Sequence, residues 1–95
     1  MSNTITVLFT MKGCPFCDQF KNMLSESNID FYEKDIDEDV EDYEMFKSIV
    51  ESDYIPALMI VTNPDKDSDT VVEYFAPEKN YNTLDEALEI VKARL

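Results

Sequence analysis

The sequence predicts one α/β domain with the element order β-α-β-α-β-β-α and a four-stranded mixed sheet between two helical layers. Short β-branched or apolar runs alternate with amphipathic stretches in which apolar residues recur every three to four positions. Two connections contain a helix and are long enough to place neighbouring strands in parallel, whereas a hairpin-length loop joins the last two strands. With 95 residues, 44% of them hydrophobic, the chain can bury one core and not two. We therefore expect a single three-layer domain over residues 1–95.

The first half of the chain supplies two strands and two helices. Thr4–Thr10 is β-branched and apolar without a polar face, which is typical of a buried strand. A helix is expected from about residue 15 to 25, and a second strand near residues 30–34. An acidic segment then leads into a second amphipathic helix. The apolar positions of that helix are Val40, Tyr43, Phe46, Ile49 and Val50.

The second half supplies two strands and a closing helix. Pro56 ends the preceding helical pattern, and residues 57–61 are apolar enough for a third strand. A polar loop at 63–69 precedes a fourth strand at 70–75, so these two strands are expected to form an antiparallel hairpin.

The closing helix is expected to begin near Leu84. Thr83 and Glu86 have the spacing of a capping box, in which each side chain satisfies a backbone N–H group of the other. Its expected buried stripe consists of Leu84, Ala87, Leu88, Val91 and Leu95.

The charge of the chain excludes several classes of partner. Asp and Glu number 21 against 8 Lys and Arg, which gives a formal net charge of −13. Nucleic acids and anionic membranes are bound through Lys and Arg, so we expect neither as a partner. The negative charge favours solubility and a protein partner with a basic docking face. The N-terminus has no basic and apolar signal-peptide pattern, and no apolar run is long enough to span a membrane, so we expect a cytoplasmic protein.

The residues available for metal binding and catalysis are few. Histidine is absent, which excludes Cys–His nucleophile pairs and histidine ligands to zinc. Acids alternate at 35–39 and 65–69 as in the start of a calcium loop. Neither run has glycine at the sixth position or glutamate at the twelfth, so no metal site is predicted. In a reducing cytosol, the two cysteines are more typical of catalysis than of a structural disulfide.

Cys14 and Cys17 lie where the first helix begins. Pro15 suits the first helical position, which makes Cys14 the N-cap. A thiolate there accepts hydrogen bonds from the backbone N–H groups of Phe16 and Cys17 and is stabilised by the helix dipole, so its pKa falls below about 8.5. Cys17 lies one turn later, within disulfide range. We expect Cys14 to attack a substrate disulfide and Cys17 to resolve the mixed disulfide, while Gly13 permits the tight turn before them.

The same cysteine pair permits two other interpretations. Both thiols can be structural and buried, or they can form half of a zinc site that a second chain completes. The proline at the first helical position and the buried strand before it favour redox chemistry.

The run Cys14-Pro15-Phe16-Cys17 resembles the Cys-Pro-aromatic-Cys signature of the glutaredoxin family, within the thioredoxin-fold superfamily. This resemblance implies a thioredoxin-like (glutaredoxin-like) fold and a cis Ile55-Pro56 bond facing Cys14. It also implies glutathione as reductant and co-substrate, with no tightly bound cofactor, and active-site support from Gly13, Pro15, Phe16 and Pro56. The glutathione contacts implied are Lys12, Phe16, the backbone of Ile55, Pro56, Thr83 and Asp85.

The sequence departs from the family pattern mildly at Ile55, where relatives usually have valine, and more strongly at three other places. Gly13 is the only glycine, so the Gly-Gly pair that holds the γ-glutamyl end of glutathione in relatives is missing, and residues 76–83 take its place. Met11 stands where relatives carry a lysine for the glycyl carboxylate, with Lys12 one residue closer to the nucleophile. Asp18 stands where relatives often have a basic residue, and its charge limits how far the Cys14 pKa falls. We therefore expect weak glutathione binding.

Several functions are consistent with these residues. The first is a glutathione-dependent reductase of protein disulfides and glutathione mixed disulfides, acting as a monomer. A second is a thioredoxin-like electron donor, reduced by a flavoprotein reductase and serving a protein such as ribonucleotide reductase. A third is a non-catalytic acidic binding module, and a fourth is a glutathione-assisted iron–sulfur dimer.

Overall fold

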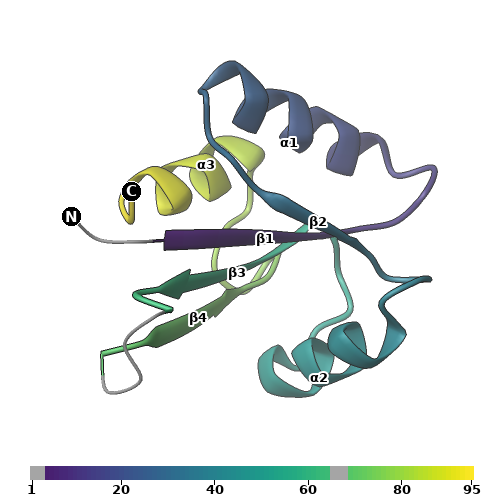
Figure 1. Ribbon diagram of the computed structural model, residues 1–95. Helices are drawn as coiled ribbons and strands as arrows, with labels where there is room; N and C mark the ends of the chain where they lie inside the picture. The colour runs from purple at the N-terminus through teal and green to yellow at the C-terminus, as the bar shows by residue number, and fades with distance from the viewer. Residues whose placement is uncertain (1–3, 65–68) are drawn as a thin grey trace.

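A four-stranded sheet with helices on both faces forms the computed structural model, which describes residues 4–64 and 69–95 (Figure 1). The elements in chain order are β1 (Thr4–Thr10), α1 (Pro15–Glu26), β2 (Tyr32–Asp35), α2 (Val40–Val50), β3 (Ala57–Thr62), β4 (Val71–Phe75) and α3 (Leu84–Lys92). Helices α1 and α3 cover one face of the sheet, and α2 covers the other (Figure 1). This arrangement confirms the predicted element order and the three layers.

The sheet has the strand order β2-β1-β3-β4. Strand β1 pairs in parallel with β2, and β3 is antiparallel to both β1 and β4. The predicted hairpin of the last two strands is therefore confirmed, and so is the parallel first crossover. The prediction that the second crossover also joins parallel neighbours is wrong. The length of a helical connection does not fix strand direction, and β3 pairs with the free edge of β1 instead of with β2.

Strand β1 is buried on both faces, and its threonines at positions 6 and 10 are buried together with its apolar residues. Leu8 points to the layer of α1 and α3, whereas Val7 and Phe9 point to α2, because neighbouring residues of a strand face opposite ways. The cluster beneath α1 and α3 includes Leu8, Phe20, Leu24, Leu58, Ile60, Ala87 and Val91. The cluster beneath α2 consists of Val7, Phe9, Tyr43, Phe46 and Ala57. The sheet is thus fixed to helices on both sides.

The structure corrects three element boundaries. Strand β2 begins at Tyr32, two residues later than expected, and β4 begins at Val71. Helix α3 ends at Lys92, so Leu95 lies beyond the helix and is exposed instead of completing the buried stripe. The capping box of Thr83 and Glu86 is confirmed. Part of the predicted loop at 63–69 lies outside the described residues.

Two properties of the described residues bear on other classes of protein. None of the described helices is long and apolar enough to cross a membrane. Within residues 4–64 and 69–95, no group of three or more His, Cys, Asp or Glu residues is arranged to hold a metal ion. Residues 65 and 67 of the second acidic run lie outside these ranges.

Candidate active site

Cys14 is the N-cap of α1, as predicted. Its backbone is extended, with φ of −99° and ψ of 104°, and Pro15 occupies the first helical position. The backbone N–H of Cys17 donates a hydrogen bond of 3.1 Å to the Cys14 sulfur. The second expected donor, the N–H of Phe16, makes no such bond in the described part of the chain. One backbone donor and the positive end of the helix therefore act on the Cys14 sulfur.

Cys14 and Cys17 form a disulfide across the first turn of α1, with their Cα atoms 5.2 Å apart. Their exposures differ in a way that separates their roles. Cys14 retains 8% of its surface, whereas Cys17 is 0% exposed. An external disulfide therefore has access to Cys14 and not to Cys17.

Gly13 takes a conformation that suits glycine. Its φ is +76°, in the left-handed region, where a side chain is strained. A Cβ built on this residue would meet nothing within 4 Å, so the requirement comes from the backbone and not from crowding. The single glycine of the chain thus stands where the strand turns into the cysteine-bearing helix.

The Ile55-Pro56 peptide bond is cis, which confirms the prediction made from the family resemblance. Pro56 is buried immediately before β3, and Ile55 is partly exposed. Both residues line a groove of about 470 Å³ together with Phe16, which follows Cys14 by two positions. The groove therefore adjoins the cysteine pair.

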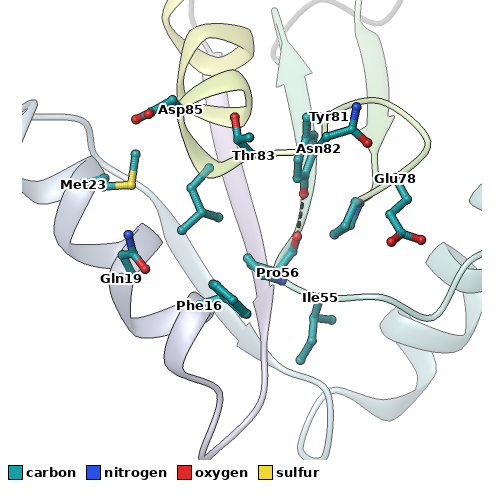
Figure 2. Close-up of a pocket in the computed structure, with 12 residues that line it drawn as sticks. Phe16, Gln19, Met23, Ile55, Pro56, Glu78, Tyr81, Asn82, Thr83 and Asp85 are labelled. Atoms are coloured by element: carbon teal, nitrogen blue, oxygen red, sulfur yellow. Dashed lines mark hydrogen bonds between the residues drawn. The ribbon is translucent and has the colours of Figure 1, made fainter.

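This groove contains most of the residues that were predicted to bind glutathione (Figure 2). Phe16, Ile55, Pro56, Thr83 and Asp85 all line it. Lys12 does not. It is exposed in the turn before Cys14, and the structure does not bring it to the other five.

Seven lining residues were not predicted from the sequence. Gln19 and Met23 follow Phe16 at helical spacing, so the face of α1 that carries Phe16 could have identified them. The other five are Pro77, Glu78, Tyr81, Asn82 and Leu84. Most of these belong to the segment that replaces the Gly-Gly pair, whose conformation no sequence pattern indicated.

Tyr81 joins the segment before α3 to the cis-proline turn. Its buried hydroxyl donates a hydrogen bond to the carbonyl of Pro56, 25 positions away (Figure 2). Burial raises the pKa of Tyr81 well above its ordinary value, so the hydroxyl stays protonated and remains a donor. Tyr81 therefore fixes one wall of the groove to another.

The backbone donors near α3 are largely used within the protein. The N–H groups of Asn82 and Thr83 donate to a carboxylate oxygen of Glu86, at 2.9 and 3.1 Å, and the N–H of Glu86 donates to Thr83. In the preceding loop, the N–H of Glu78 donates to the carbonyl of Tyr81 at 2.7 Å. The Glu86 carboxylate therefore occupies the backbone donors of Asn82 and Thr83, which an anionic ligand at this end of α3 could otherwise use.

The charge lining the groove is negative. Glu78 and Asp85 contribute carboxylates, and none of the described residues that line the groove is Lys or Arg. A groove of this composition repels an anion and attracts a cation.

A polar network ties the cysteine-bearing helix to the sheet. Lys21 of α1 contacts Asp18 at 3.4 Å and Glu33 of β2 at 3.0 Å. The hydroxyl of Thr10 donates to the same Glu33 carboxylate at 2.6 Å. The Thr10 hydroxyl and the Lys21 ammonium hold the pKa of Glu33 below its ordinary value. Asp18, which replaces the basic residue of relatives, is thus partly neutralised by Lys21.

We expect Tyr81→Phe to lower the free energy of unfolding by about 1–3 kcal/mol, because it leaves the buried Pro56 carbonyl without its donor. Urea denaturation of the oxidised protein measures this change. Tyr54→Phe is the matched control, since Tyr54 is exposed, and it should change stability by less than about 0.5 kcal/mol. Equal effects of the two substitutions would contradict a structural role for the Tyr81 hydroxyl.

A mixed sheet of this order, with a Cys-Pro-Phe-Cys pair at the start of its first helix, defines a thioredoxin-fold protein. Solved structures of this class are similar to it. The thioredoxin-like protein BC3987 aligns over 95% of this chain and 99% of its own, with a TM-score of 0.58 and 19% identity. Trichomonas vaginalis thioredoxin aligns over 95% of this chain and 74% of its own, with a TM-score of 0.59 and 17% identity.

Within this class, the sequence itself identifies the family. The glutaredoxin profile matches residues 6–63, and the chain belongs to the glutaredoxin family. The search of curated proteins found no match. Family membership and the Cys14–Cys17 pair in a thioredoxin-like fold support a thiol–disulfide oxidoreductase.

Proposed function

We propose that this protein reduces disulfides of other proteins by dithiol exchange, in the cytoplasm and as a monomer. The Cys14 thiolate attacks one sulfur of the substrate disulfide, forms a mixed disulfide and releases the first substrate thiol. The Cys17 thiol, after losing its proton, attacks the Cys14 sulfur and releases the second substrate thiol. The substrate disulfide is thereby reduced to two thiols, and the protein dithiol is oxidised to the Cys14–Cys17 disulfide.

The observation that carries this proposal is the unequal setting of the two sulfurs. The Cys14 sulfur has the helix N-terminus, a backbone donor and the remaining solvent access. The fully buried Cys17 lies within reach of Cys14 and out of reach of a bulky substrate. This arrangement suits one attacking and one resolving thiol.

We further propose that glutathione serves this protein only weakly as a reductant. Phe16, Ile55 and Pro56 line a groove suited to its cysteinyl part. Glutathione carries a net negative charge, however, and the groove has no basic lining residue among those described. A lost charge-assisted hydrogen bond costs about 1.5–3 kcal/mol. One or two losses would weaken binding roughly ten- to several-hundred-fold.

The acidic groove favours a second candidate function. A thioredoxin-like donor, reduced by a flavoprotein reductase and serving a protein such as ribonucleotide reductase, would need no glutathione site. The occupied N–H groups of Asn82 and Thr83 are compatible with this function.

Two assays on the same preparation test these proposals. The first follows reduction of a protein disulfide with dithiothreitol as reductant, and we expect clear turnover. The second follows reduction of a small glutathione mixed disulfide, with glutathione and its reductase as the only electron source. We expect measurable turnover, with an apparent glutathione affinity roughly ten- to several-hundred-fold weaker than that of a Gly-Gly glutaredoxin assayed alongside.

The possible outcomes separate the candidates. Glutathione affinity equal to that of the Gly-Gly protein would contradict the proposed weakness. The second function would be assigned if glutathione supports no turnover, and disulfide reduction proceeds when a thioredoxin-type reductase replaces glutathione and its reductase as the electron source. Inactivity in both assays would leave the acidic binding module.

A further inference from the structure

We propose that the groove beside the cysteine pair binds a cationic polypeptide segment, so that preferred substrates carry Lys or Arg close to the reactive cysteine. This inference rests on the proposed disulfide reductase function and specifies its substrate class. It follows from the position of the groove, its charge and its apolar lining.

The position of the groove makes it a contact surface for any bound substrate chain. Phe16 follows the attacking Cys14 by two residues and is 64% exposed, and its ring lines the groove. A substrate sulfur bonded to Cys14 therefore brings the residues beside the substrate cysteine within reach of the groove. Its volume of about 470 Å³ has room for one or two side chains.

The charge of the groove selects the sign of those side chains. Glu78 from the loop and Asp85 from α3 lie on opposite sides of it (Figure 2). Within the described residues, neither carboxylate forms an ion pair or a hydrogen bond, so both are available to a ligand. Lys79 is next to Glu78 in the chain but does not line the groove. The net charge of −13 on the whole chain also attracts a cationic substrate.

The uncharged lining suits Lys and Arg in particular. Both side chains have an apolar stem and a charged head. Met23, Leu84 and Pro77 offer apolar surface for the stem. The exposed ring of Phe16 offers a face on which an ammonium or guanidinium group can stack. A basic side chain can therefore contact ring, apolar wall and carboxylate together.

A matched pair of peptides tests this inference. Each peptide carries one cysteine in a mixed disulfide with the same neutral thiol, flanked by Lys in one peptide and by Glu in the other. The reduced protein reacts once with an excess of each peptide at low ionic strength, and the second-order rate constant is measured from the appearance of the free neutral thiol. We expect the Lys peptide to react roughly three- to tenfold faster, the size expected of one or two exposed ion pairs. The preference should shrink in 0.5 M salt, because exposed charges are then screened.

Two double variants with the same change in net charge locate the effect. Glu78→Gln with Asp85→Asn removes both groove carboxylates and should remove most of the preference. Glu41→Gln with Glu44→Gln changes two acids of α2, which covers the opposite face of the sheet from α1 and α3, and should retain the preference. Glu78→Gln alone, which leaves the first turn of α3 intact, should reduce the preference partly.

Each outcome has a distinct meaning. Equal rates for the two peptides with the unmodified protein would overturn the cationic preference and leave the reductase function standing. An equal loss of preference in both double variants would show that net charge, and not the groove, selects the substrate. If neither peptide reacts, the proposed reductase function itself fails.

Discussion

Replacement of Cys14 by serine is expected to abolish disulfide reduction, with a loss of about a thousandfold or more, as when other enzymes lose a covalent nucleophile. The physical reason is the reacting group, because a serine hydroxyl does not ionise near neutral pH and is a far weaker nucleophile than a cysteine thiolate. No second nucleophile can replace it, because Cys17 is fully buried and histidine is absent. Turnover of a protein disulfide with dithiothreitol measures the loss.

Cys17→Ser is the matched control for this result. Reduction of a glutathione mixed disulfide needs only one attacking thiol, because glutathione itself can release the product from Cys14. We therefore expect Cys17→Ser to retain this activity while losing most reduction of protein disulfides. The same variant should accumulate a mixed disulfide with a protein substrate, which intact-mass spectrometry detects. Equal loss of both activities in the two variants would contradict the assignment of attacking and resolving roles.

Phe20→Ala is expected to lower the free energy of unfolding by about 3–5 kcal/mol, the cost of removing a fully buried phenylalanine. Phe20 is 0% exposed and belongs to the core cluster that joins α1 to Leu8 of β1 and Leu58 of β3. A small domain has a total stability of about 5–15 kcal/mol, so this loss is a large fraction of it. Chemical denaturation of the oxidised protein, followed by far-UV circular dichroism, measures the change.

Phe16→Ala provides the comparison on the same helix with the same deleted atoms. Phe16 is exposed in the groove, so its removal should change stability by less than about 1 kcal/mol while reducing the rate with peptide substrates. Similar loss of stability in the two variants would contradict the division of α1 into a core face and a substrate face.

Features determined by neighbouring residues could be predicted from the sequence. The N-cap position of Cys14 depends on Pro15 and on the strand that ends just before it, and the capping box depends on two residues three positions apart. The two-sided burial of β1 follows from its run of β-branched and apolar residues, which contains no charged side chain. The cis Ile55-Pro56 bond was implied by the family resemblance and not by the residues themselves.

Features that depend on distant residues required the tertiary structure. The direction of β3 was predicted wrongly, because a helical connection of this length fits either orientation. The bond from Tyr81 to the carbonyl of Pro56 spans 25 positions and depends on how the loop before α3 packs against the cis-proline turn. Lys12 is close to Cys14 in sequence, yet it lies outside the groove that holds the other predicted glutathione contacts.

The sequence by itself therefore determined the chemistry of this protein, because the cysteine pair, the proline between them and the start of the helix are contiguous. Only the tertiary structure decided what surrounds that chemistry. It brings Glu78 and Asp85, from the loop before α3 and from its first turn, into one groove with Phe16 of α1. It also shows that the Glu86 carboxylate accepts hydrogen bonds from the N–H groups of Asn82 and Thr83, beside the groove. Packing between segments far apart in the chain sets the charge of the groove, and local sequence patterns do not predict that packing.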